Sequence, residues 1–195
     1  MNNTNKLNGK DLINVGIYTA MYISVFFVGG LLTTLPVVYP FLLFLLPFIC
    51  GIPMMLYYTK IRKFGMLTIT GVINGLFFFF IGYTWMAIAF WIPFGFLADV
   101  ILRFGNYNQF KFTLLSYCIY CLGEMGCHAP LFLAGQSYWD NIRKGMGDQY
   151  ADTLMKMMPH WMLYAGFIIL FAGGFCGALF GYRTLKKHFV RAGIA

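Results

Sequence analysis

Six long apolar stretches, separated by short polar connections, dominate this sequence and restrict what it can fold into. Their lengths are close to the roughly 20 residues that a helix needs to cross the hydrocarbon core of a bilayer. The stretches cover residues 12–32, 36–58, 66–81, 85–102, 110–134 and 161–182. Only 10% of the residues are charged, which is too few to cover the surface of a soluble domain. The sequence therefore predicts a membrane protein.

Helix is the expected state of every stretch, because a chain that crosses lipid must satisfy its own backbone hydrogen bonds. A membrane β-barrel would show segments of alternating hydrophobicity, and the sequence contains none. We therefore expect an all-α polytopic membrane protein with six transmembrane helices. Residues 1–195 are expected to form a single transmembrane domain that lies in the cell membrane as a multi-pass protein.

The Lys and Arg residues are distributed unevenly among the connections. Of the 14 in the chain, 11 lie at the two ends and in the second and fourth connections, and the other side holds only Arg143, Lys144 and Lys156. Because such residues collect on cytoplasmic loops, both chain ends are expected in the cytoplasm. This orientation makes residues 1–11 and the basic tail 183–195 cytoplasmic and the loop 135–160 extracellular. It also accounts for the net charge of +8 without a nucleic-acid partner, since no basic stripe is interleaved with exposed aromatics.

The connection at 135–160 is the longest in the chain and carries half of its six acidic residues. It also contains three aromatic residues, Tyr138, Trp139 and Tyr150. Long loops in compact domains often serve as lids or binding loops. Aromatic residues in this position are equally typical of the belt at a membrane interface. Both interpretations stay open at this point.

Glu124 is the residue that points most directly to a binding site. It lies in the fifth stretch, about 20 Å along a helix that begins at Phe110. A carboxylate that faces lipid at this depth costs at least about 3 kcal/mol, so Glu124 is expected to face protein or a water-filled cavity. His128, Tyr120 and Tyr117 share its helix face. This polar stripe is either the wall of a ligand site or a Glu–His pair that locks two helices together.

Other polar and sulfur-containing residues also lie inside the apolar stretches. Asn74 either contacts a ligand or forms a hydrogen bond between helices. Asp99 precedes Arg103 by one helical turn, which favours an ion pair between them or a contact with another subunit. Cys118, Cys121 and Cys127 lie near His128, but their spacing fits no closed zinc site. We therefore expect no metal and no cofactor.

Small residues recur every four positions in two stretches and predict helix contacts. Gly173, Gly177 and Gly181 in the last stretch are expected to pack within the molecule, whereas Gly16, Ala20 and Ser24 in the first favour docking of a partner protein. The second stretch holds four prolines, which predict kinks or breaks. No nucleophile elbow, P-loop, zinc-protease motif or dinucleotide fingerprint occurs, so no enzymatic activity is expected.

The opening residues 11–20 (DLINVGIYTA) and the ending residues 185–194 (LKKHFVRAGI) carry a family resemblance. Together with the six expected spans and the long fifth loop, they resemble the substrate-specific (S) components of energy-coupling factor (ECF) transporters. More closely, the chain resembles the Trep_Strep (MptD-like) family of S components over essentially its whole length. The resemblance implies an ECF S-component-like fold with both termini in the cytoplasm.

The same resemblance implies a function. An S component binds a small molecule outside the cell, often a vitamin or another micronutrient, and rotates within the membrane to release it inside. The implied partners are a transmembrane coupling subunit and two cytoplasmic ATPase subunits of an ABC importer. The family docks through an Ala-x-x-x-Ala motif on the first helix, and Gly16 and Ala20 match it here. Gly in place of the first Ala keeps this surface flat, and the resemblance does not name the ligand.

The expected cavity opens outward between the stretches 85–102, 110–134 and 161–182, with Glu124 and His128 at its floor or wall. Loop residues Tyr138 and Trp139, together with His160 and Trp161, are expected to close it. The predicted substrate-binding residues are Glu124, His128, Tyr120, Tyr117, Asn74, Trp139, Tyr138, Trp161 and His160. An aromatic cavity with one carboxylate suits a planar ring that carries a hydrogen-bond donor or a positive charge.

Two alternatives belong to other functional classes. One is a stand-alone, proton-coupled secondary transporter that uses Glu124 as its proton site. The other is a membrane metal or redox protein built on Glu124, His128 and the cysteines.

Overall fold

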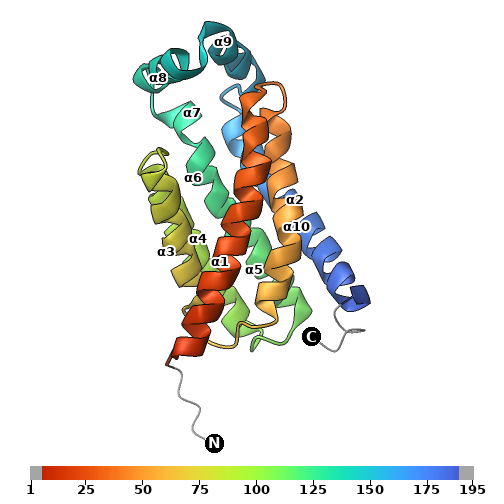
Figure 1. Cartoon of the computed structure of the whole chain (residues 1–195). Coiled ribbons are helices and arrows are strands. Elements are labelled where there is room, and N and C mark those ends of the chain that lie inside the picture. The colour runs from red at the N-terminus through yellow and green to blue at the C-terminus, as the bar shows by residue number, and fades with distance from the viewer. Residues whose placement is uncertain (1–5, 189–195) are drawn as a thin grey trace, which may run out of the picture.

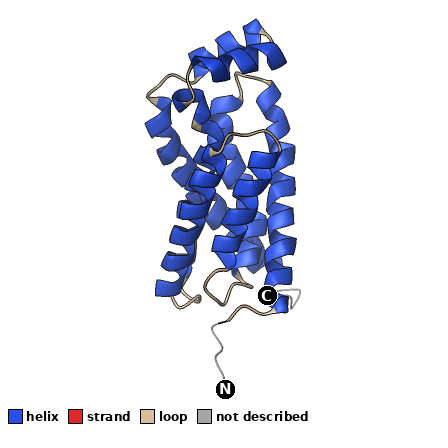
Figure 2. Cartoon of the chain, turned by 90° about the vertical axis from the view of Figure 1, so that its left-hand side faces the viewer, coloured by secondary structure: helices blue, strands red, loops and turns tan. Residues whose placement is uncertain are grey.

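A computed structural model describes residues 6–188 of the chain. These residues form a bundle of helices, with no strand among them (Figures 1 and 2). The elements are α1 (Gly9–Gly30), η1 (Leu31–Thr34), α2 (Tyr39–Tyr58), α3 (Met66–Phe80), α4 (Met86–Phe104), α5 (Phe110–Cys121), η2 (Leu122–Glu124), α6 (Met125–His128), α7 (Pro130–Leu133), α8 (Gln136–Met146), α9 (Asp148–Met157) and α10 (Met162–His188). Parts of the expected cytoplasmic segments, 1–5 and 189–195, lie outside the described residues.

Four helices are long and apolar enough to cross a membrane. They are Gly9–Thr34, which joins α1 and η1, and Tyr39–Tyr58, Met86–Phe104 and Met162–Lys187. Helix α3 is apolar but has only 15 residues, which corresponds to about 22 Å at 1.5 Å per residue. The all-α prediction is confirmed, and four of the six expected spans correspond to helices long enough to cross a membrane in the described part of the chain. The other two expected stretches form the shorter α3 and a series of short helices that begins with α5.

The fifth apolar stretch is not the single helix that the sequence predicts. Helix α5 ends at Cys121, and the chain continues through the 3₁₀ turn η2 into the short helices α6 and α7. Glu124 has φ −60° and ψ −26°, which are 3₁₀ values. Gly123 and Gly126 weaken the helix at this point, and Pro130 can supply no backbone N–H. A 3₁₀ turn has 3.0 residues rather than 3.6. The residues from Tyr117 to His128 therefore do not share one face of a regular α-helix, as the sequence analysis expects.

Helix α2 is more continuous than the sequence predicts. Its prolines predict kinks or breaks, yet it runs as one helix with Pro47 and Pro53 in its interior. The helix lies deep in the bundle, because α1, α5 and α10 all pack against it. Neighbouring helices make interior prolines tolerable in membrane proteins, since they surround the backbone groups that a proline frees.

The glycine face of α10 packs within the molecule, as the sequence predicts. A Cβ atom added to Gly173 or Gly177 would lie 2.6 Å from the carbonyl oxygen of Phe44 or Pro47, respectively. Only glycine therefore allows α10 to approach α2 this closely. The small residues of α1 behave differently, since Gly16, Ala20 and Ser24 are all exposed. A Cβ at Gly16 would meet no heavy atom within 4 Å.

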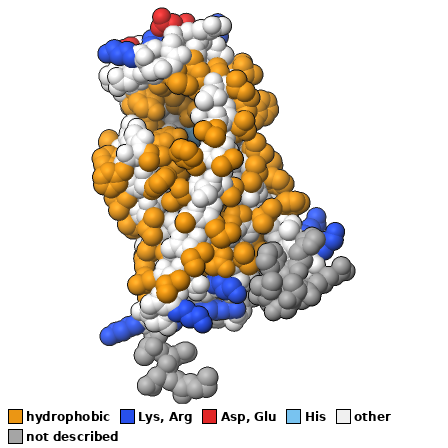
Figure 3. All heavy atoms as spheres, viewed as in Figure 1, with side chains coloured by type: hydrophobic (Ala, Val, Ile, Leu, Met, Phe, Trp, Pro, Cys, Tyr) orange, Lys and Arg blue, Asp and Glu red, His pale blue; other side chains and the backbone are white. Residues whose placement is uncertain are grey.

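The two ends of the bundle differ in their charges. Helix α1 begins and α10 ends at one end, and α8 and α9 lie across the other (Figure 1). On the face drawn in Figure 3, hydrophobic side chains cover the middle of the bundle. Lys and Arg gather where α1 begins, whereas acidic side chains together with further Lys and Arg lie around α8 and α9 (Figure 3). A broad apolar belt between two polar ends is the surface that a bilayer requires.

Candidate functional site

The backbone around Glu124 is drawn tightly against α4. A Cβ at Gly126 would come within 2.6 Å of the carbonyl oxygen of Met86, and one at Gly123 within 2.8 Å of the Trp91 ring. This contact directs Glu124 to the inside of the bundle, where its side chain is completely buried. Neither carboxyl oxygen has a hydrogen-bond partner among the described residues. A buried carboxyl group without partners is costly, so it is a typical mark of a site at which a ligand or proton is bound.

His128 links Glu124 to the outer half of α2. Its Nε2 atom lies 3.5 Å from Oε1 of Glu124, which is longer than an ordinary hydrogen bond. Its Nδ1 atom lies 3.0 Å from the hydroxyl of Tyr39. If Tyr39 donates to Nδ1, the remaining ring proton is on Nε2 and is directed at Glu124. The sequence correctly predicts the neighbourhood of Glu124 and His128 but does not indicate the tyrosine behind them.

The other predicted polar residues bond to neighbouring helices. The amide nitrogen of Asn74 donates to the Tyr120 hydroxyl over 2.7 Å, which is the hydrogen bond between helices that one interpretation expects. The Tyr117 hydroxyl donates to the carbonyl oxygen of Pro47 over 2.6 Å. Unpartnered polar atoms nevertheless remain in this core among the described residues, namely Asn74 Oδ1 and the Tyr22 hydroxyl.

A cavity of about 450 Å³ lies beyond Tyr39, at the end of the bundle where α8 and α9 lie. Its lining consists of Tyr39, Ile81, Gly82, Tyr83, Leu131, Tyr138, Ile142, Met146, Tyr150 and Leu154. None of these residues is charged, and four are tyrosines. The volume falls within the range of small-molecule sites. We call this space the outer cavity.

The outer cavity differs in position from the cavity that the sequence predicts. Its residues come from the start of α2, the turn after α3, and α7 to α9, rather than from between the fourth, fifth and sixth stretches. Glu124 and His128 do not line it directly. They lie behind its wall, because Tyr39 both lines the cavity and contacts His128.

Helices α8 and α9 roof this cavity. The chain turns between them at Gly147, whose φ of +88° is accessible mainly to glycine. Arg143 joins the two helices through ion pairs with Asp152 and Asp148, and these hydrogen bonds raise the pKa of Arg143. The Tyr150 hydroxyl donates to the Thr33 carbonyl oxygen over 2.6 Å and thus ties the roof to η1. The lid interpretation of residues 135–160 therefore agrees with this arrangement.

The predicted aromatic residues of this region separate into three groups. Tyr138 lines the cavity, and burial raises its pKa, so it presents a neutral hydroxyl. Trp139, also on α8, is buried in a cluster of apolar side chains that includes Leu154 and Met158. His160 and Trp161 do not belong to the cavity wall, because both lie in the turn before α10 and are exposed, Trp161 by 63%. The structure therefore does not bring these two residues to the outer cavity, whereas the sequence analysis expects them to close a cavity.

Asp99 also acts differently from the sequence prediction. It forms no ion pair with Arg103 within residues 6–188, and its Oδ2 atom instead accepts hydrogen bonds at the start of α3. The donors are the backbone N–H groups of Gly65 (3.0 Å) and Thr68 (2.8 Å) and the Thr68 hydroxyl (2.8 Å). The N–H groups at a helix start have no partner within their own helix, and the partly positive helix end favours a carboxylate there.

Three tyrosines line the outer cavity although they are absent from the predicted binding residues: two lie near the outer ends of apolar stretches and one lies in the loop 135–160. Tyr39, Tyr83 and Tyr150 all line the outer cavity. In the sequence, a tyrosine in this position cannot be distinguished from a member of an interfacial belt. Only the fold shows that these three, from distant parts of the chain, surround one space.

The cysteines do not form a metal site with these residues. Within residues 6–188, no group of three or more His, Cys, Asp or Glu side chains has an arrangement that could hold a metal ion. Cys118, Cys121 and Cys127 are buried free thiols.

Comparison with known proteins identifies the family of the chain. A family model described as "Hypothetical bacterial integral membrane protein (Trep_Strep)" matches residues 9–191. No match was found among curated proteins or among solved structures. The matched segment contains every helix described above, including both ends of the bundle. The chain therefore belongs to the Trep_Strep family of bacterial integral membrane proteins and is a multi-pass protein of the cell membrane.

Proposed function

We propose that this protein is the substrate-binding (S) subunit of an ECF-type ABC importer, which captures a small molecule outside the cell. The observation that carries the proposal is the outer cavity, roofed by α8 and α9 and adjoining the buried pair Glu124–His128 through Tyr39. In this proposal the protein catalyses no reaction. It delivers its ligand by docking on a transmembrane coupling subunit driven by two cytoplasmic ATPases.

The proposal includes six membrane passes with both termini in the cytoplasm. The passes are α1, α2, α3, α4, the broken unit α5–α7 and α10. Two features support this arrangement: α1 begins and α10 ends at the same end of the bundle, and basic side chains gather there (Figures 1 and 3). Cytoplasmic ends of membrane proteins carry such an excess of Lys and Arg. The roofed cavity then faces outward.

The lining of the cavity indicates which ligands it suits. Tyrosine rings bind flat apolar surfaces, and their hydroxyls form hydrogen bonds at the ring edge. No charged residue lines the cavity, so a strongly charged ligand would lose its hydration without compensation. The proposed ligand is a planar, vitamin-sized ring compound with at least one hydrogen-bond donor.

In this proposal, Glu124 accepts a hydrogen bond from the donor group of the ligand. Its two oxygens lack partners in the structure, and His128 and Tyr39 are the side chains that stand between it and the cavity. A shift of the Tyr39–His128 contact would let an N–H group or a cationic group of the ligand reach the carboxyl group. A hydrogen bond to a charged group contributes about 1.5–3 kcal/mol, so this contact would account for a large share of selectivity.

The outward face of α1 suits the proposed docking on a coupling subunit. Gly16, Ala20 and Ser24 are exposed, and the Ser24 hydroxyl donates back to the Ala20 carbonyl oxygen over 2.8 Å. The hydroxyl thus lies against its own helix, and the surface is flat enough for another helix to approach closely.

Mass spectrometry of small molecules that co-purify with the detergent-solubilised protein tests the proposal. We expect one ring compound to be retained by the wild-type protein. Glu124→Gln and His128→Ala are each expected to weaken its binding by about tenfold or more. Asp140→Asn, on the exposed side of α8, is the matched control and should bind normally. Thermal unfolding of each variant separates lost binding from lost folding, and unchanged binding by both folded variants would contradict the site.

One observation also favours a second function. An unpartnered buried carboxyl group beside a histidine is an arrangement found in proton-coupled carriers. In this alternative, Glu124 takes up a proton on one side and releases it on the other. Uptake that persists without the ATPase subunits but stops with a protonophore would support the carrier and contradict the S-subunit proposal.

A further inference from the structure

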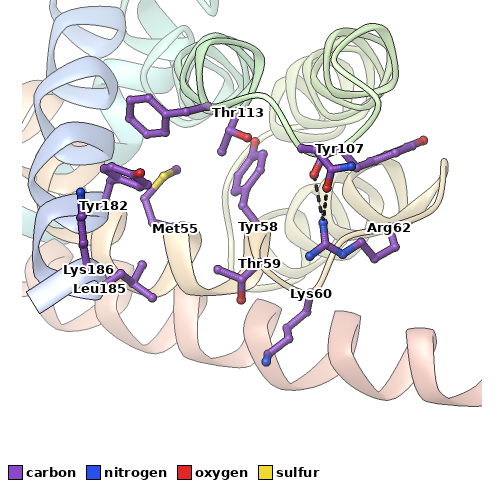
Figure 4. Close-up of a pocket in the computed structure, with 12 residues that line it drawn as sticks. Met55, Tyr58, Thr59, Lys60, Arg62, Tyr107, Thr113, Tyr182, Leu185 and Lys186 are labelled. Carbon is purple, nitrogen blue, oxygen red and sulfur yellow. Dashed lines mark hydrogen bonds between the residues drawn. The ribbon is translucent and has the colours of Figure 1, made fainter. Parts of the chain in front are cut away.

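A second cavity, of about 630 Å³, lies at the end of the bundle where α1 begins. Its lining is Met55, Tyr58, Thr59, Lys60, Arg62, Tyr107, Asn108, Phe110, Thr113, Tyr182, Leu185 and Lys186 (Figure 4). These residues come from the end of α2, the loops after α2 and α4, the start of α5 and the end of α10. We call this space the basal cavity. It is separate from the outer cavity and shares no residue with it.

Positive charge distinguishes the basal cavity from the outer one. Lys60, Arg62 and Lys186 belong to its lining, and none of the twelve lining residues is acidic. Among the described residues, no ion pair includes Lys60 or Lys186. Three cations in one recess without an anion create a positive potential that favours an anionic ligand.

Arg62 is held in place by the loop after α4. Its Nη1 atom donates to the Tyr107 carbonyl oxygen over 3.1 Å and to Oδ1 of Asn108 over 3.0 Å (Figure 4). A guanidinium has five N–H donors, so the donors on Nη2 and Nε remain for a ligand. An oriented Arg with free donors is a common element of phosphate recognition.

The wall opposite Arg62 is mainly apolar and aromatic, and Lys186 lies on this side, beside Tyr182 and Leu185 (Figure 4). Phe110 and Tyr182 pack together with their ring centroids 4.1 Å apart, and Met55 and Leu185 are buried beside them. Tyr182 is 43% exposed and thus reaches the surface of the bundle. The recess therefore combines two cations on one side with an apolar surface and a third cation, Lys186, on the other (Figure 4).

We infer that the basal cavity binds the phosphate headgroup of an anionic phospholipid from the adjacent membrane leaflet. The cations contact the phosphate, and the acyl chains lie against Phe110 and Tyr182. Basic recesses between membrane helices are suited to such headgroups. A free phosphate ion would contact only the cations and would leave the apolar residues uncovered. This inference does not depend on the substrate-binding function proposed above.

Thermal unfolding of the delipidated, detergent-solubilised full chain tests the inference. We expect phosphatidylglycerol to raise the melting temperature, with little effect of phosphatidylcholine or inorganic phosphate. In the double variant Lys60→Gln/Lys186→Gln, the affinity for phosphatidylglycerol should fall about fivefold for each lysine, and so by roughly twenty-five-fold together. The double variant Lys144→Gln/Lys156→Gln removes the same charge at the other end of the bundle and should bind as the wild type does.

Several results would overturn the inference. Equal stabilisation of both double variants by phosphatidylglycerol would exclude these lysines from the site. Equal effects of phosphatidylcholine would show that the headgroup charge is not recognised, and equal effects of inorganic phosphate would show an anion site rather than a lipid site. If the basal variant fails to fold, competition between the two lipids for the wild-type protein in native mass spectrometry replaces it. Retention without preference for phosphatidylglycerol would then contradict the inference.

Discussion

Asp99 stabilises the start of a helix to which it does not belong. Helix α3 follows Gly65, which has no side chain to cap it. The carboxylate of Asp99, on α4, accepts the hydrogen bonds that a capping residue would otherwise accept. Its charge also favours this position, because the N-terminal end of a helix is partly positive. A single residue thus ties two adjacent helices together at the end of the bundle.

Replacement of Asp99 by Ala should lower the free energy of unfolding by about 2 kcal/mol, because three donors lose their acceptor. Asp99→Asn keeps one acceptor oxygen and should lose less. Denaturant titration of the purified protein measures both changes. Arg103→Ala serves as the comparison, since no hydrogen bond joins it to Asp99 in the described part of the chain. A loss in Arg103→Ala equal to that in Asp99→Ala would indicate that the ion pair exists after all.

Close packing determines the arrangement at the scale of the helices. Between membrane helices the hydrophobic effect is weak, so van der Waals contact over small residues holds them together. Helix α10 lies against α2 through Gly173 and Gly177, and the segment η2–α6 lies against α4 through Gly123 and Gly126. The second contact is what places Glu124 inside the bundle.

A matched pair of glycine variants tests the difference between a packed and an open helix face. In Gly177→Ala the added Cβ would meet the Pro47 carbonyl oxygen at 2.6 Å, so we expect a loss of about 1–3 kcal/mol in unfolding free energy. In Gly16→Ala the Cβ meets no heavy atom within 4 Å, so stability should stay the same or rise by up to about 1 kcal/mol. Thermal unfolding in detergent compares the two. Equal stability of both variants would contradict the α2–α10 contact.

At the scale of the whole molecule, the two cavities and the exposed face of α1 are three separate surfaces, each with its own proposed binding role. The outer cavity adjoins Glu124, the basal cavity carries the cations, and the flat face of α1 lies along the side of the bundle. Because these surfaces share no residue, a substitution in one of them should leave the others intact. That separation makes the proposed docking of α1 testable by itself.

Ala20→Trp adds a bulky ring to the flat face of α1. It should abolish co-purification with the proposed coupling subunit while ligand retention stays unchanged, because Ala20 is exposed and does not line the outer cavity. Ile168→Trp places the same ring on an exposed position of α10 and should leave assembly intact. Affinity purification through a tag on the coupling subunit measures both. Normal assembly of Ala20→Trp would show that α1 is not the docking surface.

The fold class and the burial of key residues can be predicted from the sequence alone, because few backbone structures satisfy their hydrogen bonds within lipid. Long apolar stretches must form helices, which determined the all-α, multi-pass membrane fold. The family was identified separately, by the match of the Trep_Strep model to residues 9–191. Burial of Glu124 beside His128 follows in the same way, since a carboxyl group cannot face acyl chains at little cost. The glycine face of α10 was also predictable, because close helix contacts need small residues.

Tertiary structure alone decided where these residues meet. Tyr39 and His128 are 89 positions apart, so no local pattern could pair them. The interruption of the fifth helix at η2 and the capping of α3 by Asp99 depend on contacts with other helices. Local periodicity indicates which face of a helix is polar. The helix that packs against that face depends on how the whole bundle folds.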